Sequence, residues 1–144
     1  MFKIGPVFIA ALVLAGCAGT SAAPSAGGAA SGRVTGTVTY LQRVSMPPSA
    51  VIKVQLVDVS RADAPATMLG EQIITAAGKQ VPFAFEIAYD PAKIDQRFNY
   101  AVQARIEDGG KLLFINDQRY AVITRGTPTH VDMVLKAVAG LAPK

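Results

Sequence analysis

Hydrophobic and polar residues alternate along much of the chain from residue 34 onward, which is the pattern of half-buried β-strands. In the first such stretch, 34–40, Val, Gly, Val and Tyr alternate with three Thr, so a threonine face is predicted to point outward. The clearest alternation spans 83–89, where two Phe, one Ile and one Tyr alternate with Ala, Glu and Ala. The same pattern predicts further strands at 52–56, 69–75, 100–106, 112–115, 120–123 and 131–135.

Turn-forming residues separate these segments at intervals of about 10–15 residues, and no segment has the period of a long helix. Asp108-Gly109-Gly110 is a strong hairpin signal, and 90–94 is expected to form a turn or a single helical turn. Seven or eight short strands predict an all-β domain. Between the two common architectures we favour an antiparallel Greek-key β-sandwich over a small barrel.

The alternating pattern also predicts which tyrosines, and which residues of the last strand, face the core. Tyr100 opens its strand just after a corner of the chain, as in the tyrosine corner of Greek-key sandwiches, although a plain core position explains it equally well. Tyr40 and Tyr89 are expected to face inward as well, which leaves Tyr120 as the one free tyrosine. In the last strand three residues are expected to face inward: Val131, Met133 and Leu135.

The first 16 residues have the composition of a bacterial signal peptide. Lys3 supplies the positive charge, and 4–14 form an apolar stretch that is too short for a transmembrane helix of about 20 residues. This stretch ends in a lipobox, the motif at which bacterial lipoproteins are cut and lipidated: Leu14, Ala15, Gly16 and Cys17. The alternative is a plain secretory leader with an incidental cysteine. We predict cleavage before Cys17.

Cys17, the single cysteine, is therefore predicted to carry a covalent diacylglycerol on its sulfur and an acyl chain on its new amino group. More than one acyl chain makes membrane attachment stable. Residues 18–32 contain only Ala, Gly, Ser, Thr and Pro, so 17–32 is expected to be a lipidated, flexible linker with a reach of about 20 Å. Ala18 stands where an Asp commonly retains lipoproteins in the inner membrane, which favours the periplasmic face of the outer membrane.

The rest of the chain is divided into a β-sandwich domain at 33–138 and a C-terminal tail at 139–144. The 144 residues carry a formal net charge of +4, but the Lys and Arg residues are scattered. Nucleic-acid-binding domains gather their cations on one face or along one helix, so no nucleic-acid partner is expected. Charged residues are expected to pair across strands: Arg43 with Asp58, and Arg105 with Glu86.

The folded part offers little catalytic or metal-binding chemistry. His130 is the only histidine, and its register in the last strand places it on the outer face with Thr129 and Asp132 nearby. One histidine and one acylated cysteine exclude the usual zinc ligand sets, and the acidic residues lack the spacing of a calcium loop. A glycosidase-like pair of carboxylates would depend on strands that bring distant residues together. We therefore expect no enzyme, no metal site and no cofactor apart from the covalent lipid.

Several short segments follow one another along 34–138 in a recognisable order. They are Gly36-Thr37-Val38-Thr39-Tyr40, Arg43 with Met46-Pro47-Pro48, Leu56-Val57-Asp58-Val59-Ser60, Gly78-Lys79-Gln80-Val81-Pro82-Phe83, Tyr89-Asp90-Pro91, Ala104-Arg105-Ile106, and Leu112-Leu113-Phe114 with Asn116-Asp117. In this order and spacing they resemble the YbaY-type lipoproteins, which are related to the YscW-like pilotin lipoproteins of type III secretion. Met46 stands where that family more often has Leu.

The resemblance implies a β-sandwich lipoprotein of the cell envelope, and the pilotin branch implies that it helps a secretin ring to reach or assemble in the outer membrane. Our leading hypothesis is a non-enzymatic, membrane-tethered module that binds an envelope protein partner, such as a secretin, by adding a strand at an exposed sheet edge. The alternative is a binding module for a glycan or another small ligand of the envelope. That alternative needs exposed aromatic side chains, for which Tyr120 is the one candidate.

Overall fold

A computed structural model describes residues 31–139, which form eight β-strands and one short 3-10 turn, η1 (Pro91–Lys93). The strands are β1 (Gly32–Tyr40), β2 (Val51–Asp58), β3 (Thr67–Thr75), β4 (Phe83–Tyr89), β5 (Tyr100–Asp108), β6 (Lys111–Ile115), β7 (Tyr120–Val122) and β8 (His130–Ala137). Every predicted strand is present, and the single helical turn lies where it was expected. No helix within 31–139 is long and apolar enough to cross a membrane.

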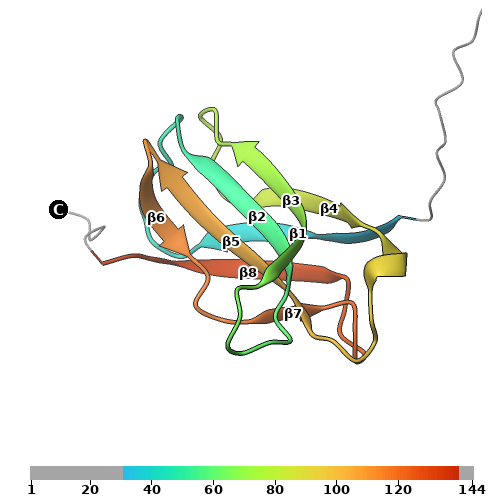
Figure 1. Ribbon diagram of the computed structural model, residues 1–144. Helices are drawn as coiled ribbons and strands as arrows, with labels where there is room; N and C mark the ends of the chain where they lie inside the picture. The colour runs from blue at the N-terminus through green and yellow to red at the C-terminus, as the bar shows by residue number, and fades with distance from the viewer. Residues whose placement is uncertain (1–30, 140–144) are drawn as a thin grey trace, which may run out of the picture.

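The strands form one continuous, rolled sheet in the order β3-β2-β5-β6-β8-β1-β4. The roll places β4, β1 and β8 in one layer and β3, β2, β5 and β6 in a second layer that crosses the first at an angle (Figure 1). A short pairing of β6 with β8 joins the two layers, and β7 pairs with the beginning of β5, next to the part of β5 that pairs with β6. The all-β sandwich prediction is confirmed, in a form that is close to a closed barrel.

One pair of strands departs from the expected antiparallel arrangement. β1 and β8 are parallel, with a register from Thr35↔His130 to Tyr40↔Leu135. Parallel neighbours cannot be joined by a hairpin and need a crossover connection. Here all six other strands lie between the two in the sequence, so no turn signal could reveal this pairing.

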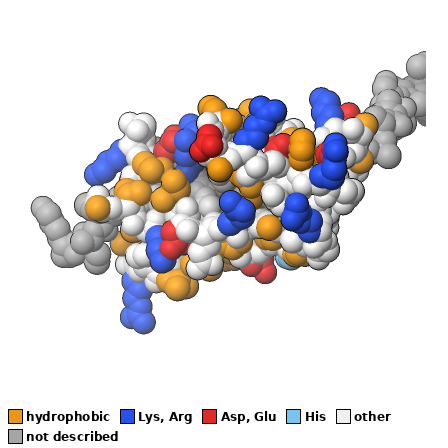
Figure 2. All heavy atoms as spheres, turned by 60° about the horizontal axis from the view of Figure 1, so that its bottom comes forward, with side chains coloured by type: hydrophobic (Ala, Val, Ile, Leu, Met, Phe, Trp, Pro, Cys, Tyr) orange, Lys and Arg blue, Asp and Glu red, His pale blue; other side chains and the backbone are white. Residues whose placement is uncertain are grey.

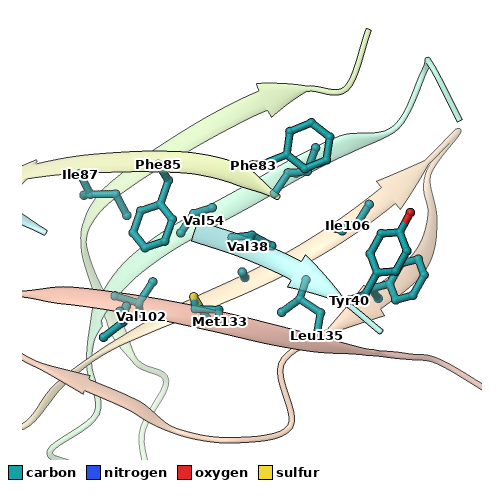
Figure 3. Close-up of a cluster of buried hydrophobic side chains, with 14 of the residues drawn as sticks. Val38, Tyr40, Val54, Phe83, Phe85, Ile87, Val102, Ile106, Met133 and Leu135 are labelled. Carbon is teal, nitrogen blue, oxygen red and sulfur yellow. The ribbon is translucent and has the colours of Figure 1, made fainter. Parts of the chain in front are cut away.

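The core fills the space between the two layers, and the inward-facing side chains of the alternating segments form it (Figure 3). The predicted inward set of β8 is confirmed, because Val131, Met133 and Leu135 are all buried. Tyr40 is buried too, and its ring stacks on Phe114 with a centroid distance of 4.2 Å and an interplanar angle of 12°. Such aromatic pairs contribute about 0.5–1.5 kcal/mol beyond their buried area.

The first and last strands of the rolled sheet, β3 and β4, face each other without a regular ladder of hydrogen bonds. The Gln72 side chain of β3 bridges them, because its Oε1 accepts a hydrogen bond from the Glu86 N–H at 2.6 Å. Gly70 approaches β4 so closely that a Cβ there would lie 2.6 Å from Cγ2 of Ile87. These two strands therefore cover each other's edges, which limits the room for strand addition.

The edge of β8 that faces β7 is covered by a single side chain. The Tyr120 hydroxyl accepts a hydrogen bond from the Val134 N–H at 2.9 Å and donates one to the Val134 carbonyl at 3.3 Å. Tyr120 is half-buried, so the expectation of a free tyrosine is wrong. The side chain fills the gap between two strands that are too far apart to form a ladder.

Two local predictions about turns are confirmed. Gly109 and Gly110 connect β5 to β6 with φ angles of +55° and +82°, the pair of positive angles that a tight hairpin turn requires. Tyr100 is buried, and its hydroxyl accepts a hydrogen bond from the Asp95 N–H at 3.0 Å. This bond to the backbone five residues upstream is the contact expected of a tyrosine corner.

Candidate functional site

The predicted lipidation motif, Leu14, Ala15, Gly16 and Cys17, lies outside the residues that the structure describes. The predicted signal peptide, most of the linker and the end of the C-terminal tail lie outside them as well. Cleavage before Cys17 and the lipid on its sulfur therefore stay predictions.

His130 lies on the outer face of the β1–β8 pair, as predicted. Its Nδ1 is 3.0 Å from the Thr35 hydroxyl, and its Nε2 is 3.5 Å from a carboxylate oxygen of Asp132. A hydroxyl, an imidazole and a carboxylate thus lie in a row, as in a catalytic triad. The His130 side chain, however, is 63% exposed on an open sheet face. Nucleophilic catalysis needs a site that holds the substrate beside the reacting groups, and His130 lines none of the hollows described below. Within 31–139 no three His, Cys, Asp or Glu residues are grouped to hold a metal ion.

Both predicted cross-strand ion pairs are wrong. Arg43 follows β1 at one end of the molecule, whereas Asp58 ends β2 at the other end, where it accepts hydrogen bonds from Ser60. Arg105 and Glu86 lie in different layers of the sandwich. Arg105 instead pairs with Glu107 of the same strand at 3.2 Å, and Glu86 pairs with Arg33 of the adjacent strand β1 at 2.8 Å.

Figure 2 shows apolar side chains at several places on one face of the molecule, among scattered Lys and Arg side chains. Among the described residues, one group of exposed apolar side chains lines a groove at the end of the sandwich where β3 begins. Met68 and Phe98, which are 55% and 41% exposed, line a hollow of about 310 Å³. A second hollow of about 290 Å³ shares Asp58, Thr67 and Phe98 with the first. We call the combined surface the apolar groove; it is lined by Asp58, Arg61, Ala64, Pro65, Thr67, Met68, Leu69, Lys93, Phe98 and Tyr100.

A β-bulge brings Met68 to the surface. The pairing of β2 with β3 shifts between Leu56 and Val57, because Leu56 pairs with Gly70 and Val57 pairs with Met68. The extra residue is Leu69. Side chains of a strand alternate between its faces, so one extra residue moves Met68 out of the inward-facing set to which Gly70 belongs. The bulge therefore creates one wall of the groove.

Three neighbouring segments hold Phe98 in place. Its carbonyl accepts a hydrogen bond from the Thr124 hydroxyl at 2.8 Å, and its own N–H donates to the Asp95 carbonyl at 3.0 Å. The next residue, Asn99, donates its N–H to the Ser60 hydroxyl at 2.8 Å and accepts from the Val59 N–H at 2.9 Å. A large apolar side chain is thus exposed on a well-supported backbone rather than on a loose loop.

Charged groups lie along the rim of the apolar groove. Asp58, Arg61 and Lys93 line it, and the ion pair of Asp95 with Arg97 lies beside Phe98 in the chain. The hydrogen bonds from the Arg97 side chain and backbone lower the pKa of Asp95 to about 2. Asp95 is therefore ionised at neutral pH. The groove combines an apolar floor with a rim of both charge signs, which is typical of protein-binding surfaces.

Sequence reasoning did not find this groove. The strand predicted from the sequence begins at Leu69, so Met68 lies outside the predicted strand. Phe98 lies in a polar stretch between Asp95 and Tyr100, and an aromatic residue among charged loop residues is a signal that could have been used. The bulge and the contacts among the three segments have no local signature.

Comparison with known proteins places this fold in a family. Residues 29–135 match the family model of the type III secretion system lipoprotein chaperones, YscW. The chain belongs to this family. It is 37% identical over 142 residues to the uncharacterised lipoprotein YbaY of Escherichia coli K12, a match that covers 89% of this chain and 74% of YbaY. The expected resemblance is confirmed.

A solved structure adds a relative with a described role. An alternative pilotin from the type II secretion system of Vibrio cholerae is 47% identical and superposes with a TM-score of 0.74. The match covers 76% of this chain and 99% of the pilotin chain. That pilotin chain consists of little more than the unit described here, so a β-sandwich of this kind folds without further domains. The matched family is thus one of lipoprotein chaperones, YbaY is a lipoprotein, and the solved relative is a pilotin.

Proposed function

We propose that this protein is a non-enzymatic, lipid-anchored chaperone of the cell envelope that binds a secretin subunit in the apolar groove. The observation that carries the proposal is the exposure of Met68 and Phe98 in one hollow, with the Phe98 backbone held by hydrogen bonds on both sides. Aromatic anchors in preformed pockets dominate the energy of protein interfaces, and Met adapts well to varied partners. Family membership supports the choice of a secretin as the partner.

The position of the groove supports a role close to the membrane. β1 begins at Gly32, which pairs with Tyr89 at the end of β4, and the segment that carries Phe98 follows directly after β4. The predicted linker from Cys17 would therefore leave the domain at the same end as the groove. With a reach of about 20 Å, it would keep a bound secretin segment near the periplasmic face of the outer membrane.

The proposal predicts that groove variants lose partner binding while the fold stays intact. We suggest that full-length Met68→Gln and Phe98→Gln be tested for binding to the secretin subunit of the same bacterium, with purified proteins. Leu41→Gln is the matched control, since Leu41 is 80% exposed in the segment after β1, at the opposite end of the molecule. Removing a buried aromatic or Met contact of about 1.5–3 kcal/mol should weaken binding about 10- to 100-fold.

Anchoring is tested separately by Cys17→Ser. This variant should bind the secretin as tightly as the native chain in solution, yet fail to increase the amount of assembled secretin in outer-membrane fractions. If Met68→Gln and Phe98→Gln bind normally, or if Leu41→Gln is equally weak, the apolar groove is not the docking site. If Cys17→Ser supports full secretin assembly in cells, lipid anchoring is not part of the function.

A further inference from the structure

A second, polar surface lies on the outer face of β2 and β5, beside the ends of β6 and β7. It consists of two hollows of about 180 and 230 Å³ that share Gln103 and Asn116. We call this surface the polar furrow. Its polar lining includes Lys53, Gln55, Gln103, Arg105, Asn116 and Arg119. None of these residues lines the apolar groove.

The charge of the polar furrow is positive. Lys53 and Arg105 share one carboxylate, that of Glu107, at 2.8 and 3.2 Å. The hydrogen bond from Lys53 lowers the pKa of Glu107, so this carboxylate is ionised at neutral pH and offsets only one of the two cations. Arg119 forms no ion pair with any residue of 31–139, and the one acid of the furrow, Asp117, is paired with Lys136.

Arg105 keeps hydrogen-bonding capacity that the domain does not use. Its ion pair with Glu107 is made through Nε, and its terminal guanidinium nitrogens have no hydrogen-bond partner within the described part of the chain. A guanidinium presents several N–H groups in a fixed plane and binds carboxylates with two parallel hydrogen bonds. The free part of Arg105 is therefore suited to an additional carboxylate.

Two amide side chains of the furrow are used within the domain. Gln55 Nε2 donates to the Glu71 carboxylate at 2.8 Å, and Asn116 accepts from the Ala104 N–H at 2.9 Å and donates to the Gln118 carbonyl at 2.9 Å. Gln103 lies directly opposite Gln55 on the neighbouring strand. The Gln103 amide has no hydrogen-bond partner in the range 31–139. A side-chain amide both donates and accepts, as an extended peptide backbone requires.

We propose that the polar furrow binds an extended acidic peptide segment, whose carboxylates are taken by Arg105 and Arg119 and whose backbone pairs with Gln103. Charge complementarity favours an acidic occupant, because the three cations of the lining outnumber the acids that line the furrow or pair with these cations: Glu107, which Lys53 and Arg105 share, and Asp117, which is paired with Lys136. The surface is separate from the apolar groove. It does not depend on the secretin proposal.

The test is fluorescence anisotropy with a labelled octapeptide of alternating Asp and Ser, titrated with the fragment 31–144. The charge control is the same peptide with Asn in place of Asp. Arg105→Gln and Arg119→Gln should each weaken binding about tenfold, since each removes a charge-assisted contact. Arg43→Gln, which removes the same charge from an exposed site elsewhere, should change the affinity less than twofold.

Circular dichroism and thermal unfolding of each variant show whether it is folded. If Arg105→Gln is unstable, Arg119→Gln carries the test alone, because Arg119 holds no ion pair within 31–139. Equal binding of the Asp and Asn peptides overturns the proposal. So does an equal loss in Arg43→Gln, which would indicate unspecific attraction to a basic protein. Binding of a neutral polysaccharide that competes with the Asp peptide would instead assign the furrow to a glycan.

Discussion

Gly36 offers the sharpest test of how closely β1 approaches its two neighbours, β8 and β4, within one layer. It lies in the middle of β1, opposite Val131 of the parallel strand β8 and Phe85 of the antiparallel strand β4. A Cβ at this position would lie 2.8 Å from the carbonyl carbon of Val131, closer still to its oxygen, and 3.0 Å from the Phe85 ring. The Phe85 ring can move, but the Val131 carbonyl is main chain. Gly36→Ala must therefore push β1 away from β8.

The expected cost follows from this contact. Inserting a methyl group into a packed site costs about 1–3 kcal/mol, and a main-chain neighbour favours the upper end. Since about 1 kcal/mol corresponds to about 4–8 °C for a domain of this size, Tm should fall by about 10 °C or more. Without the clash, Gly36→Ala would instead stabilise the fold by about 0.4–1 kcal/mol through the unfolded chain. A lower Tm for Gly36→Ala therefore supports the clash with Val131, and a higher Tm contradicts it.

The assay is thermal and urea unfolding followed by circular dichroism. Thr39→Ala, a change on the outer face of the same strand, is the control and should cost no more than about 1 kcal/mol. A Gly36→Ala protein that is as stable as the native chain would refute the close approach of β1 to Val131. In that case the parallel pairing of β1 with β8 would need to be reconsidered.

Two further predictions concern single side chains. Because the pKa of Asp95 falls from 3.8 to about 2 in the folded state, its pairing with Arg97 stabilises the fold above about pH 4 and is lost as the pH falls toward 2. Asp95→Asn should flatten this part of the stability–pH curve, and an unchanged curve would contradict the ion pair. Gln72→Ala should speed hydrogen exchange of the Glu86 amide in NMR spectra, because that N–H loses its acceptor; unchanged exchange would show that β3 and β4 are held together in another way.

The strands could be predicted because their signal is local. In β4 the buried residues Phe83, Phe85 and Ile87 alternate with exposed neighbours, so seven consecutive residues contain the whole pattern. The hairpin at Gly109 and Gly110 is equally local, since the turn requires two positive φ angles. The alternation of apolar and polar residues indicates which face of a strand is buried. It does not indicate which other strand is its neighbour in the sheet.

Pairing between strands depends on the whole chain, and there the predictions were incomplete. All other strands lie between β1 and β8 in the sequence, so no turn residues indicate that these two strands pair in parallel. The ion pair expected between Arg105 and Glu86 failed because the two residues lie in different layers: Glu86 pairs with Arg33 of the adjacent strand β1, and Arg105 pairs with Glu107 of its own strand. Charge pairing is a consequence of the topology and cannot be used to derive it.

The lipobox is a linear motif, whereas the candidate surfaces form only when the chain folds. A lipobox is recognised as a linear segment, so Leu14 to Cys17 can be predicted without a fold. The apolar groove requires a bulge at Leu69 and loops from three parts of the chain that meet at Phe98, so it exists only after folding. A variant that unfolds the sandwich should therefore lose the groove and keep the lipid. The proposed lipid anchoring and the proposed partner binding should therefore be separable, and a folded Phe98→Gln protein is expected to reach the same membrane as the native protein without its partner.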